Sequence, residues 1–389
     1  MELLTTSLDN LVSALVSLLL GMAAVIAVFA FLFLIGYLFL LWYKNRNREK
    51  DSLNSVLLQV AVPRDNETKI DTAEQLFSSF VSISKGGRFN PGQHLSFEIV
   101  GMPGDIRFYV HVPKTLQDMV EKQINGAYPE AEIEVVGGSA DENHEKTIGN
   151  EYNIFSEHGK VAFMSLKLKN ENYKPIKVYK DLPVDPLLPI TSVLAKMITG
   201  EGAAIQILAA PAGDEWQKLG KSYISKTKKT EANPETAKYS SDAKELEAIE
   251  NKISKAGFNV TVRIVVSSSS MESAKIHLEN IINAFSQFAG LNSFAKNKNH
   301  FKGLFMTDFI YRYLPIRGQT SVLTTEEMAT IFHFPKKLEF SSPIFPLERL
   351  INRIFPSSIT FLKLKALSDW PIMFLTILFV TKRPNLDTI

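Results

Sequence analysis

A run of 33 residues without a charged side chain, residues 11–43, constrains this chain more than any other feature. A bilayer core of roughly 30 Å is crossed by about 20 apolar residues in a helix. The run is therefore long enough for one membrane-spanning helix and too short for two. It ends in Trp42 and Tyr43, aromatic residues of the kind that favour the headgroup region. The sequence predicts a single-pass membrane anchor with a basic flank within residues 1–50.

The charges on either side of the run predict its orientation. Two acidic residues precede it, Glu2 and Asp9, and four basic residues follow it directly: Lys44, Arg46, Arg48 and Lys50. Basic flanks stay on the cytoplasmic side of a membrane. We therefore expect a protein of the cell (inner) membrane, with its N-terminus outside and its bulk in the cytoplasm. A cleaved signal peptide is the rival interpretation, disfavoured by the length of the run and by the missing basic n-region and cleavage site.

The part of the chain after the anchor is nearly neutral and contains no cysteine. The whole chain has a formal net charge of +2, and the charges that flank the anchor account for about half of it. A dedicated nucleic-acid-binding domain usually carries a strong basic bias, so this composition argues against that class. The lack of cysteine excludes disulfides, zinc–thiolate sites and cysteine nucleophiles, and it fits a cytoplasmic location.

Residues 51–137 have the pattern of a first α+β unit. Strands are predicted at residues 55–62, 94–101, 105–112 and 131–136, with a hairpin turn at Met102-Pro103-Gly104. Apolar residues at helical spacing separate the first strand from the second and the third from the fourth. Asp71 and Glu74 predict a capping box at the first of these helices, whose core residues include Phe77. Val120 lies on the apolar stripe of the second helix. The order β-α-β-β-α-β is that of the ferredoxin-like arrangement.

Residues 138–159 are predicted to be an acidic loop, and residues 160–335 a second ferredoxin-like unit. Strands are expected at residues 160–168, 203–209 and 258–266, and helices at residues 187–200, 214–225, 242–257 and 274–285. Three segments repeat a strand, a break of small residues or proline, and a helix, which predicts an internal duplication. Residues 225–241 are rich in lysine and poor in apolar residues, so we expect a disordered insert there.

No motif in the sequence predicts a catalytic, cofactor or metal site. Residues 213–222 resemble a phosphate-binding loop, but six residues instead of four separate Gly213 from Gly220-Lys221, and they have a helical pattern. The seven histidines lack the spacing of zinc proteases, and a G-x-S-x-G nucleophile elbow is missing. The serine run at residues 267–270 is explained by helix capping, with Ser270 as the N-cap.

Two alternatives to a non-catalytic role stay open. The first is a nucleotide hydrolase that uses Lys221, for which a solvated helix is the simpler interpretation. The second is a DNA-binding module that uses the basic run at residues 226–229 to contact phosphates. A solubilising linker explains that run more simply.

Several stretches of the chain resemble one known family. They are residues 73–80, 94–99, 106–113, 120–124 with Tyr128-Pro129, and 323–335 (LTTEEMATIFHFP). Together they are similar to the amino-terminal, pre-motor region of membrane-anchored TraG/HerA-like conjugation and type IV secretion ATPases. The resemblance covers residues 55–335. In that family a RecA-like motor with a phosphate-binding loop follows, and it drives DNA or protein through a membrane channel.

The chain departs from this family after Pro335. Residues 336–389 contain neither a phosphate-binding loop nor an acidic strand of the Walker B type, so the ATPase activity and its site residues do not carry over. The apolar run at residues 371–380 is too short to span a bilayer. Two origins of this tail stay open: a frameshifted or truncated reading frame, or a segment that docks to a partner.

The sequence therefore predicts a membrane-anchored scaffold that is not an enzyme and needs no cofactor. It would be an assembly component of a conjugation or type IV secretion-like translocation system, or a truncated translocation ATPase that lacks its motor. The expected partners are the lipid bilayer, further copies of the chain in a homo-oligomer, and a motor ATPase or secretion-channel subunits supplied in trans. DNA is a weaker candidate partner.

Overall fold

The computed structural model describes residues 2–63, 66–83, 92–136, 152–232, 243–297, 301–315 and 320–335. It confirms the predicted α+β class, because helices pack on an antiparallel sheet within these residues. Most of the predicted acidic loop, residues 137–151, and the tail at residues 336–389 lie outside the described residues, as does the insert at residues 233–242.

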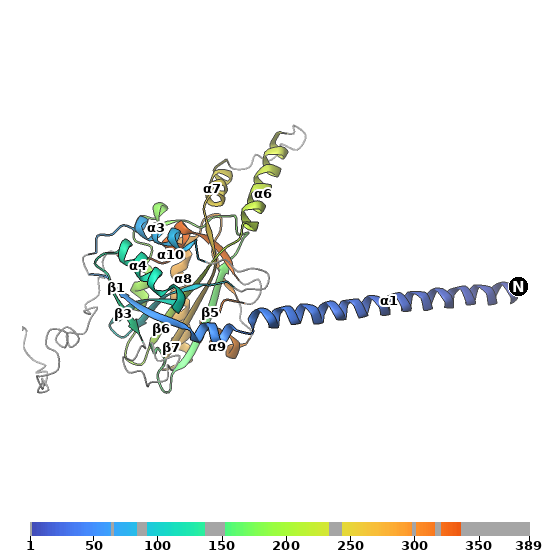
Figure 1. The fold of residues 1–389 in the computed structure, drawn as a ribbon, viewed down its shortest axis with the longest axis horizontal. Coiled ribbons are helices and arrows are strands. Elements are labelled where there is room, and N and C mark those ends of the chain that lie inside the picture. The colour runs from blue at the N-terminus through green and yellow to red at the C-terminus, as the bar shows by residue number, and fades with distance from the viewer. Residues whose placement is uncertain are drawn as a thin grey trace, which may run out of the picture. The chain divides into compact units, whose positions relative to one another are not determined.

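Helix α1 spans Glu2–Asn45 and contains the predicted anchor (Figure 1). Within it, the segment Ala14–Leu40 is 27 residues long and is not buried by any other part of the described chain. Its large apolar side chains are open, and Phe33 is 78% exposed. Exposed apolar surface of this extent marks a place of contact with lipid or protein. By length and composition, this segment is a helix that can cross a membrane once.

Nine strands form one antiparallel sheet in the order β4-β1-β3-β2-β6-β7-β5-β8, and β9 pairs with the first residues of β7. The strands are β1 Ser55–Ala61, β2 Leu95–Met102, β3 Asp105–Pro113, β4 Glu132–Val136, β5 Lys160–Leu168, β6 Gly202–Pro211, β7 Gly257–Ser268, β8 Phe294–Asn297 and β9 Ser321–Thr324. The hairpin between β2 and β3 closes at the predicted turn, where Met102 pairs with Asp105 and Gly104 has a φ of 70°.

The sheet consists of two halves that share one strand order and meet at β2 and β6. In the first half, β1 to β4 pair in the order fourth, first, third, second. In the second half, the order from the outer edge inward is β8-β5-β7-β6, which is again fourth, first, third, second. At the seam, the second strands of the two halves, β2 and β6, pair in antiparallel orientation. The pairing runs from Leu95–Ala209 to Gly101–Ala203. This repeat supports the predicted duplication, and the ferredoxin-like assignment of each half stays a prediction.

Five helices cover one face of the sheet and enclose the main core. They are α3 Ile70–Phe80, α4 Gln117–Ala127, α5 Leu188–Leu194, α8 Met271–Ala284 and α10 Thr325–Ile331. Phe77 and Val120, the predicted core residues, are 1% and 0% exposed. The ring of Phe77 packs edge-on against Phe97 at 5.0 Å between centroids. Three short 3₁₀ turns complete this layer: η1 Lys114–Leu116, η2 Tyr179–Asp181 and η3 Phe285–Phe288.

A smaller apolar cluster lies on the opposite face, under helix α9 (Lys302–Ile310). Phe305 of α9 stacks on Phe163 of β5 at 4.4 Å, and Tyr152 stacks on Tyr109 of β3 at 5.2 Å. A short helix, α2 (Arg48–Leu53), leads from α1 into β1. Helices α6 (Glu215–Ala232) and α7 (Ala243–Ile253) pack against each other around Ile249. Figure 1 shows this helical pair in yellow-green and gold.

Four sequence predictions are wrong in detail. The helix predicted at residues 242–257 ends at Ile253, and Gly257 already begins β7. Helix α3 begins after Lys69 without a side-chain cap, because Asp71 and Glu74 bond to the Tyr179 hydroxyl instead of forming a capping box. The helix predicted at residues 187–200 ends at Leu194. The stretch 225–232, predicted to be disordered, is the last part of α6. Helix α7 packs against α6 and stabilises it. Helices α2, α9 and α10 and strands β8 and β9 were not predicted.

Candidate functional site

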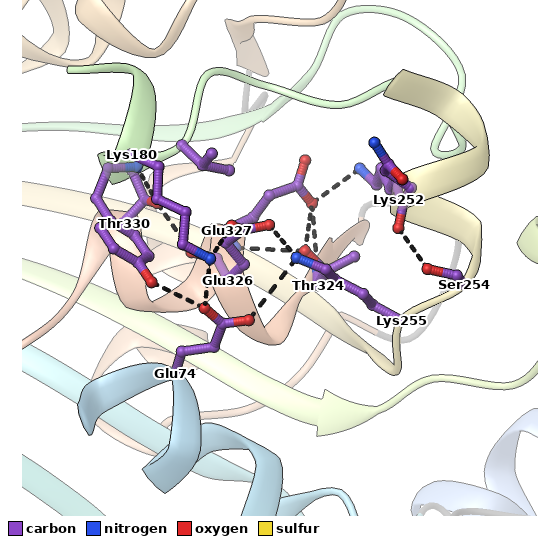
Figure 2. A network of polar contacts seen from close by, with 12 residues as sticks. Glu74, Lys180, Lys252, Ser254, Lys255, Thr324, Glu326, Glu327 and Thr330 are labelled. Carbon is purple, nitrogen blue, oxygen red and sulfur yellow. Dashed lines mark hydrogen bonds and ion pairs between the residues drawn. The ribbon is translucent and has the colours of Figure 1, made fainter. Parts of the chain in front are cut away.

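The densest group of charged side chains surrounds β9 and α10, inside the passage at residues 323–335 (Figure 2). Thr324 is the N-cap of α10. Its hydroxyl accepts a hydrogen bond from the Glu327 amide at 3.3 Å, and the Glu327 carboxylate accepts one from the Thr324 amide at 2.9 Å. This reciprocal capping box satisfies two amides that the start of a helix otherwise leaves open. The capping box therefore holds the Glu327 side chain in place independently of its ion pair.

The inner ion pair joins Glu327 to Lys252 of α7. Nζ of Lys252 lies 2.9 Å from Oε2 of Glu327, and both side chains are 1% exposed. The same ammonium donates to the carbonyl oxygens of Lys174 and Val322, at 3.2 and 3.1 Å, so each of its three protons has an acceptor. Burial lowers the pKa of Lys252, and the charge of Glu327 opposes that shift. The second carboxylate oxygen of Glu327 accepts from the Ile176 amide at 2.9 Å.

The outer cluster consists of Glu74, Lys180, Lys255 and Glu326, and it lies nearer the surface. Lys180 reaches Glu326 at 2.7 Å and Glu74 at 3.3 Å, while Lys255 bonds to Glu326 and lies 3.8 Å from Glu74. Burial alone raises the pKa of Glu326, but hydrogen bonds from Lys180 and Lys255 outweigh it and lower that pKa. Figure 2 shows how Glu74 of α3, Lys180 of η2, Glu326 of α10 and Lys255, just after α7, converge here.

A second network lies on the other face of the sheet as a row of polar residues in register across six strands. Its members, in strand order, are Gln59, Tyr109, Glu98, Gln206, Arg263 and Ser165. Gln206 donates to Glu98 at 3.1 Å and accepts from Arg263 at 3.0 Å. We call these six residues the polar row. It crosses the seam between the two halves, because Glu98 of β2 pairs with Gln206 of β6.

Arg312 neutralises the buried carboxylate of the polar row. Its Nε lies 2.7 Å from Oε1 of Glu98, with side chains 6% and 0% exposed. The hydroxyl of Tyr152 donates to the other oxygen of Glu98 at 2.8 Å. Burial raises the pKa of Glu98, but the charge and hydrogen bond of Arg312 outweigh it, so that pKa is lowered and the carboxylate stays ionised.

The residues just after the membrane helix connect to this network. Nη2 of Arg48 lies 3.3 Å from Oδ1 of Asp308 in α9, and its guanidinium lies 3.9 Å from the centre of the Tyr313 ring. Ser52 donates to the Tyr311 carbonyl at 2.6 Å. Asp308 in turn lies 3.8 Å from Arg263 of the polar row. Helix α2 is therefore bonded to α9 and, through Asp308, to the centre of the sheet.

In both networks the charged side chains are paired with one another. One further cluster contains serine, histidine and glutamate, but both Ser268 and Ser273 donate to Glu201, at 2.8 and 3.0 Å. His277 also contacts Glu201, at 3.2 Å, so the imidazole is not placed to activate a hydroxyl. Within the described residues, no group of three or more histidine or acidic side chains could hold a metal ion.

The structure places Lys221 on the open side of α6, not in a phosphate-binding loop. Gly220 lies inside that helix, where an added Cβ would come within 2.7 Å of Ile253. Lys221, Lys228 and Lys229 line a groove of about 820 Å³ between α6 and α7. Residues 226–229 thus belong to a helix and not to a linker. Ser270 caps α8 as predicted, with its hydroxyl accepting from the Ser273 amide at 3.0 Å.

The described histidines serve as structural partners of nearby groups. His94 bonds to the Arg312 carbonyl at 2.8 Å, and His111 contacts the Ser55 hydroxyl at 2.6 Å. His333 lies 3.1 Å from Asp185, and His158 is exposed. His144 and His300 lie outside the described residues. Among the described residues, no three histidine or acidic side chains gather into a group that could hold a metal ion.

Sequence reasoning missed the two buried ion pairs for different reasons. The spacing of Thr324 and Glu327 is a capping-box signal that was present in the sequence and overlooked. Lys252 lies on the apolar stripe of α7 with Ile249 and Ile253, which is a weak sign of burial. Glu98 and Arg312 are 214 residues apart, and no local pattern connects them.

Fold and site together define an α+β protein with one candidate membrane-spanning helix and charged networks on both faces of a single antiparallel sheet. The chain belongs to the family described as a domain of unknown function, DUF8128, whose model matches residues 45–338. This match begins at the end of α1 and includes every strand of the sheet. The resemblance to TraG/HerA-like ATPases stays a prediction.

The comparisons with individual proteins add little. No curated protein matches the chain. Among solved structures, the crystal structure of aclacinomycin oxidoreductase matches with a TM-score of 0.29 and 11% sequence identity. The match covers 60% of this chain, which spans about two fifths (41%) of that protein's length. A likeness this low carries no argument about fold or activity.

Proposed function

We propose that this protein is a membrane-anchored, non-catalytic scaffold of a conjugation or type IV secretion-like translocation assembly. The observation that carries the scaffold role is the bonding of α2 to α9, which fixes the sheet to the end of the membrane helix without a long linker. A scaffold must hold a defined position at the membrane, and a short connection that is bonded to the domain suits this task. The translocation context is supported by the sequence resemblance of residues 55–335.

The buried networks support a structural role in this proposal. Charges removed from water are costly unless each is paired and hydrogen-bonded, and buried pairs have been linked to a unique arrangement of elements in some proteins. Here the pairs Lys252–Glu327 and Arg312–Glu98 each neutralise a buried carboxylate, one on each face of the sheet. They hold separate segments in fixed positions, which suits a part of an assembly.

The proposed topology follows from the charges around the membrane helix. Two acidic residues precede the run and four basic residues follow it, which favours an outer N-terminus and a cytoplasmic sheet in the inner membrane. In the proposal the scaffold is a homo-oligomer, and it presents the sheet to a motor ATPase or to channel subunits supplied in trans.

The proposal is tested by in-cell cross-linking of the full chain, followed by purification from membranes and identification of what is attached. We expect the chain to be linked to copies of itself and to a motor ATPase or channel subunit. The same purified chain is assayed for ATP hydrolysis, together with its Lys221→Ala variant. Hydrolysis by the chain that the variant loses would overturn the non-catalytic role, and a strictly monomeric chain without such partners would overturn the scaffold.

A second candidate function is contact with a polyanion such as DNA, which the lysine-lined groove on α6 favours. Phosphate contacts are weakened steeply by salt. Binding that falls with salt, and that falls further in a Lys221→Ala, Lys228→Ala, Lys229→Ala variant, would support this candidate. Lys122→Ala on α4 is the matched control, since Lys122 is exposed but far from the groove in sequence and is paired with Asp118.

A further inference from the structure

Helix α9 has a row of exposed apolar side chains next to its bond with the anchor. Phe301 and Leu304 are 69% and 67% exposed, while Phe305 and Phe309 are buried against the sheet. Residues three and four apart share a helix face, so Phe301, Leu304 and Asp308 form one stripe. Asp308 is the residue that bonds to Arg48 of α2. The exposed apolar pair therefore lies on the same stripe as the residue through which α9 contacts the juxtamembrane helix.

The length of chain between the membrane and this bond is short. The apolar span ends at Leu40, and α1 continues to Asn45, which is about 8 Å of helix and comparable to the thickness of one headgroup layer. Arg48 follows three residues after Asn45 and so lies within about 10 Å of it. Because Arg48 bonds to Asp308, the exposed stripe of α9 is held close to the membrane surface.

We propose that α9 is a second membrane contact, in which Phe301 and Leu304 enter the interface of the same bilayer that α1 crosses. This inference rests on the anchoring role of α1. Aromatic and aliphatic side chains of an interfacial helix bury themselves at the boundary between headgroups and acyl chains. The exposed basic residues nearby, Arg46, Lys50 and Lys302, suit anionic headgroups. The bilayer is the occupant that the short tether to α1 favours over a separate protein.

The structural consequence is a two-point attachment. A single helix leaves the domain beyond it able to rotate and tilt, whereas a second contact on α9 fixes which face of the sheet is turned to the lipid. The face with the polar row would then lie toward the membrane. The face with α3, α4 and the outer cluster would lie toward the cytoplasm.

The chain contains no cysteine, so a single environment-sensitive label can be placed without background. The full chain with Leu304→Cys is labelled with NBD at that cysteine and placed in vesicles of phosphatidylcholine and phosphatidylglycerol. The vesicles also contain a lipid that bears a doxyl quencher near its headgroup. Lys122→Cys on α4, whose side chain is 73% exposed, is the control on the opposite face of the sheet, and Phe33→Cys is the control inside the anchor. Neither replaced side chain at positions 304 and 122 belongs to the core, so the melting temperature should not change.

We expect the label at position 304 to emit at shorter wavelength and to be quenched by the doxyl lipid, and the label at position 122 to show neither effect. Adding Phe301→Ser should reduce the quenching at position 304. Quenching at position 33 without quenching at position 304 would overturn the second contact and leave the anchor intact. A blue shift at position 304 without lipid quenching would assign this face to a protein and also overturn it. Loss of quenching at position 33 would overturn the anchor itself.

Discussion

Lys252 and Glu327 form an ion pair of 2.9 Å in which both side chains are 1% exposed. The two residues belong to helices α7 and α10, and the pair is extended by bonds to the backbone of β9 and of residues 174–176. Every proton of the ammonium has an acceptor. The passage at residues 323–335, which was notable in the sequence for its resemblance to secretion ATPases, therefore has a structural task in this chain.

Removal of one partner of this pair should strongly destabilise the protein. Glu327→Gln keeps the shape of the side chain but leaves the Lys252 charge buried and uncompensated, which costs about 3–5 kcal/mol. Denaturant unfolding of the full chain in detergent measures this loss. The double variant Lys252→Met, Glu327→Gln should regain part of it, because no buried charge remains. A single variant as stable as the parent would show that the pair is not buried.

Phe77→Ala should open a cavity in the main core. The ring is 1% exposed and contacts Phe97, so the expected loss is about 3–5 kcal/mol in the free energy of unfolding. The matched control is Phe301→Ala, which removes the same atoms from an exposed position and should cost little. Equal losses in the two variants would contradict the assignment of the core.

The protein should lose stability as pH falls from about 6.5 to 4, in part because of His94. Burial, with the nearby charges of Arg263 and Arg48, lowers the pKa of His94 to about 4, despite its bond to the Arg312 carbonyl. The unfolded state therefore binds the proton more readily, so stability is full above about pH 6.5 and declines below it. The shift corresponds to at most about 3 kcal/mol.

The measurement for His94 is the unfolding midpoint between pH 7 and pH 4 in the parent and in His94→Gln. The variant should flatten the decline, while His158→Gln, at an exposed position, should follow the parent. His111, whose pKa burial also lowers, contributes in the same direction and is tested by His111→Gln. If stability declines with pH in His94→Gln and in His111→Gln as it does in the parent, the acid sensitivity belongs to carboxylates instead.

Arg48→Ala should loosen the bond between the membrane helix and the sheet without unfolding either. Arg48 and Asp308 are partly exposed, so the pair contributes about 1 kcal/mol or less, with a similar amount from the contact with Tyr313. Hydrogen exchange of α9 should become faster in the variant, and membrane extraction should be unchanged. Exchange in α4, which contacts neither residue, is the internal control.

Much of the fold could be predicted because local signals agree with it. Alternating apolar residues, the Met102-Pro103-Gly104 turn and the Ser270 cap each identify an element that the structure contains. A repeat was also visible in the sequence, as three segments with a strand, a break and a helix, but the order in which the strands of each half pair was not. The pairing of β2 with β6 was not, because a seam between two edge strands depends on contacts between residues more than 100 positions apart.

The failures have physical causes that a local pattern does not contain. Residues 225–232 contain no apolar side chain larger than that of Ala232, yet they extend a helix that α7 already supports through Ile224 and Ile249. Asp71 and Glu74 have the spacing of a capping box, but both carboxylates instead accept from the hydroxyl of Tyr179, which lies more than 100 residues later in the sequence. The candidate site was the hardest part to predict, because its charged residues come together only once the sheet has formed.

The joining of the two halves along β2 and β6 has a consequence for how far such a sheet can grow. In a repeat array each unit offers one surface and receives a different one, so copies can be added without limit. Here both halves contribute the equivalent strand, as in the isologous contact of a two-fold symmetric dimer. Such a contact uses the equivalent strand of both halves, so neither β2 nor β6 remains as an edge. The strand order of the described sheet then ends in β4 and β8, the fourth strand of each half, which are again equivalent ends and the places where another strand could pair.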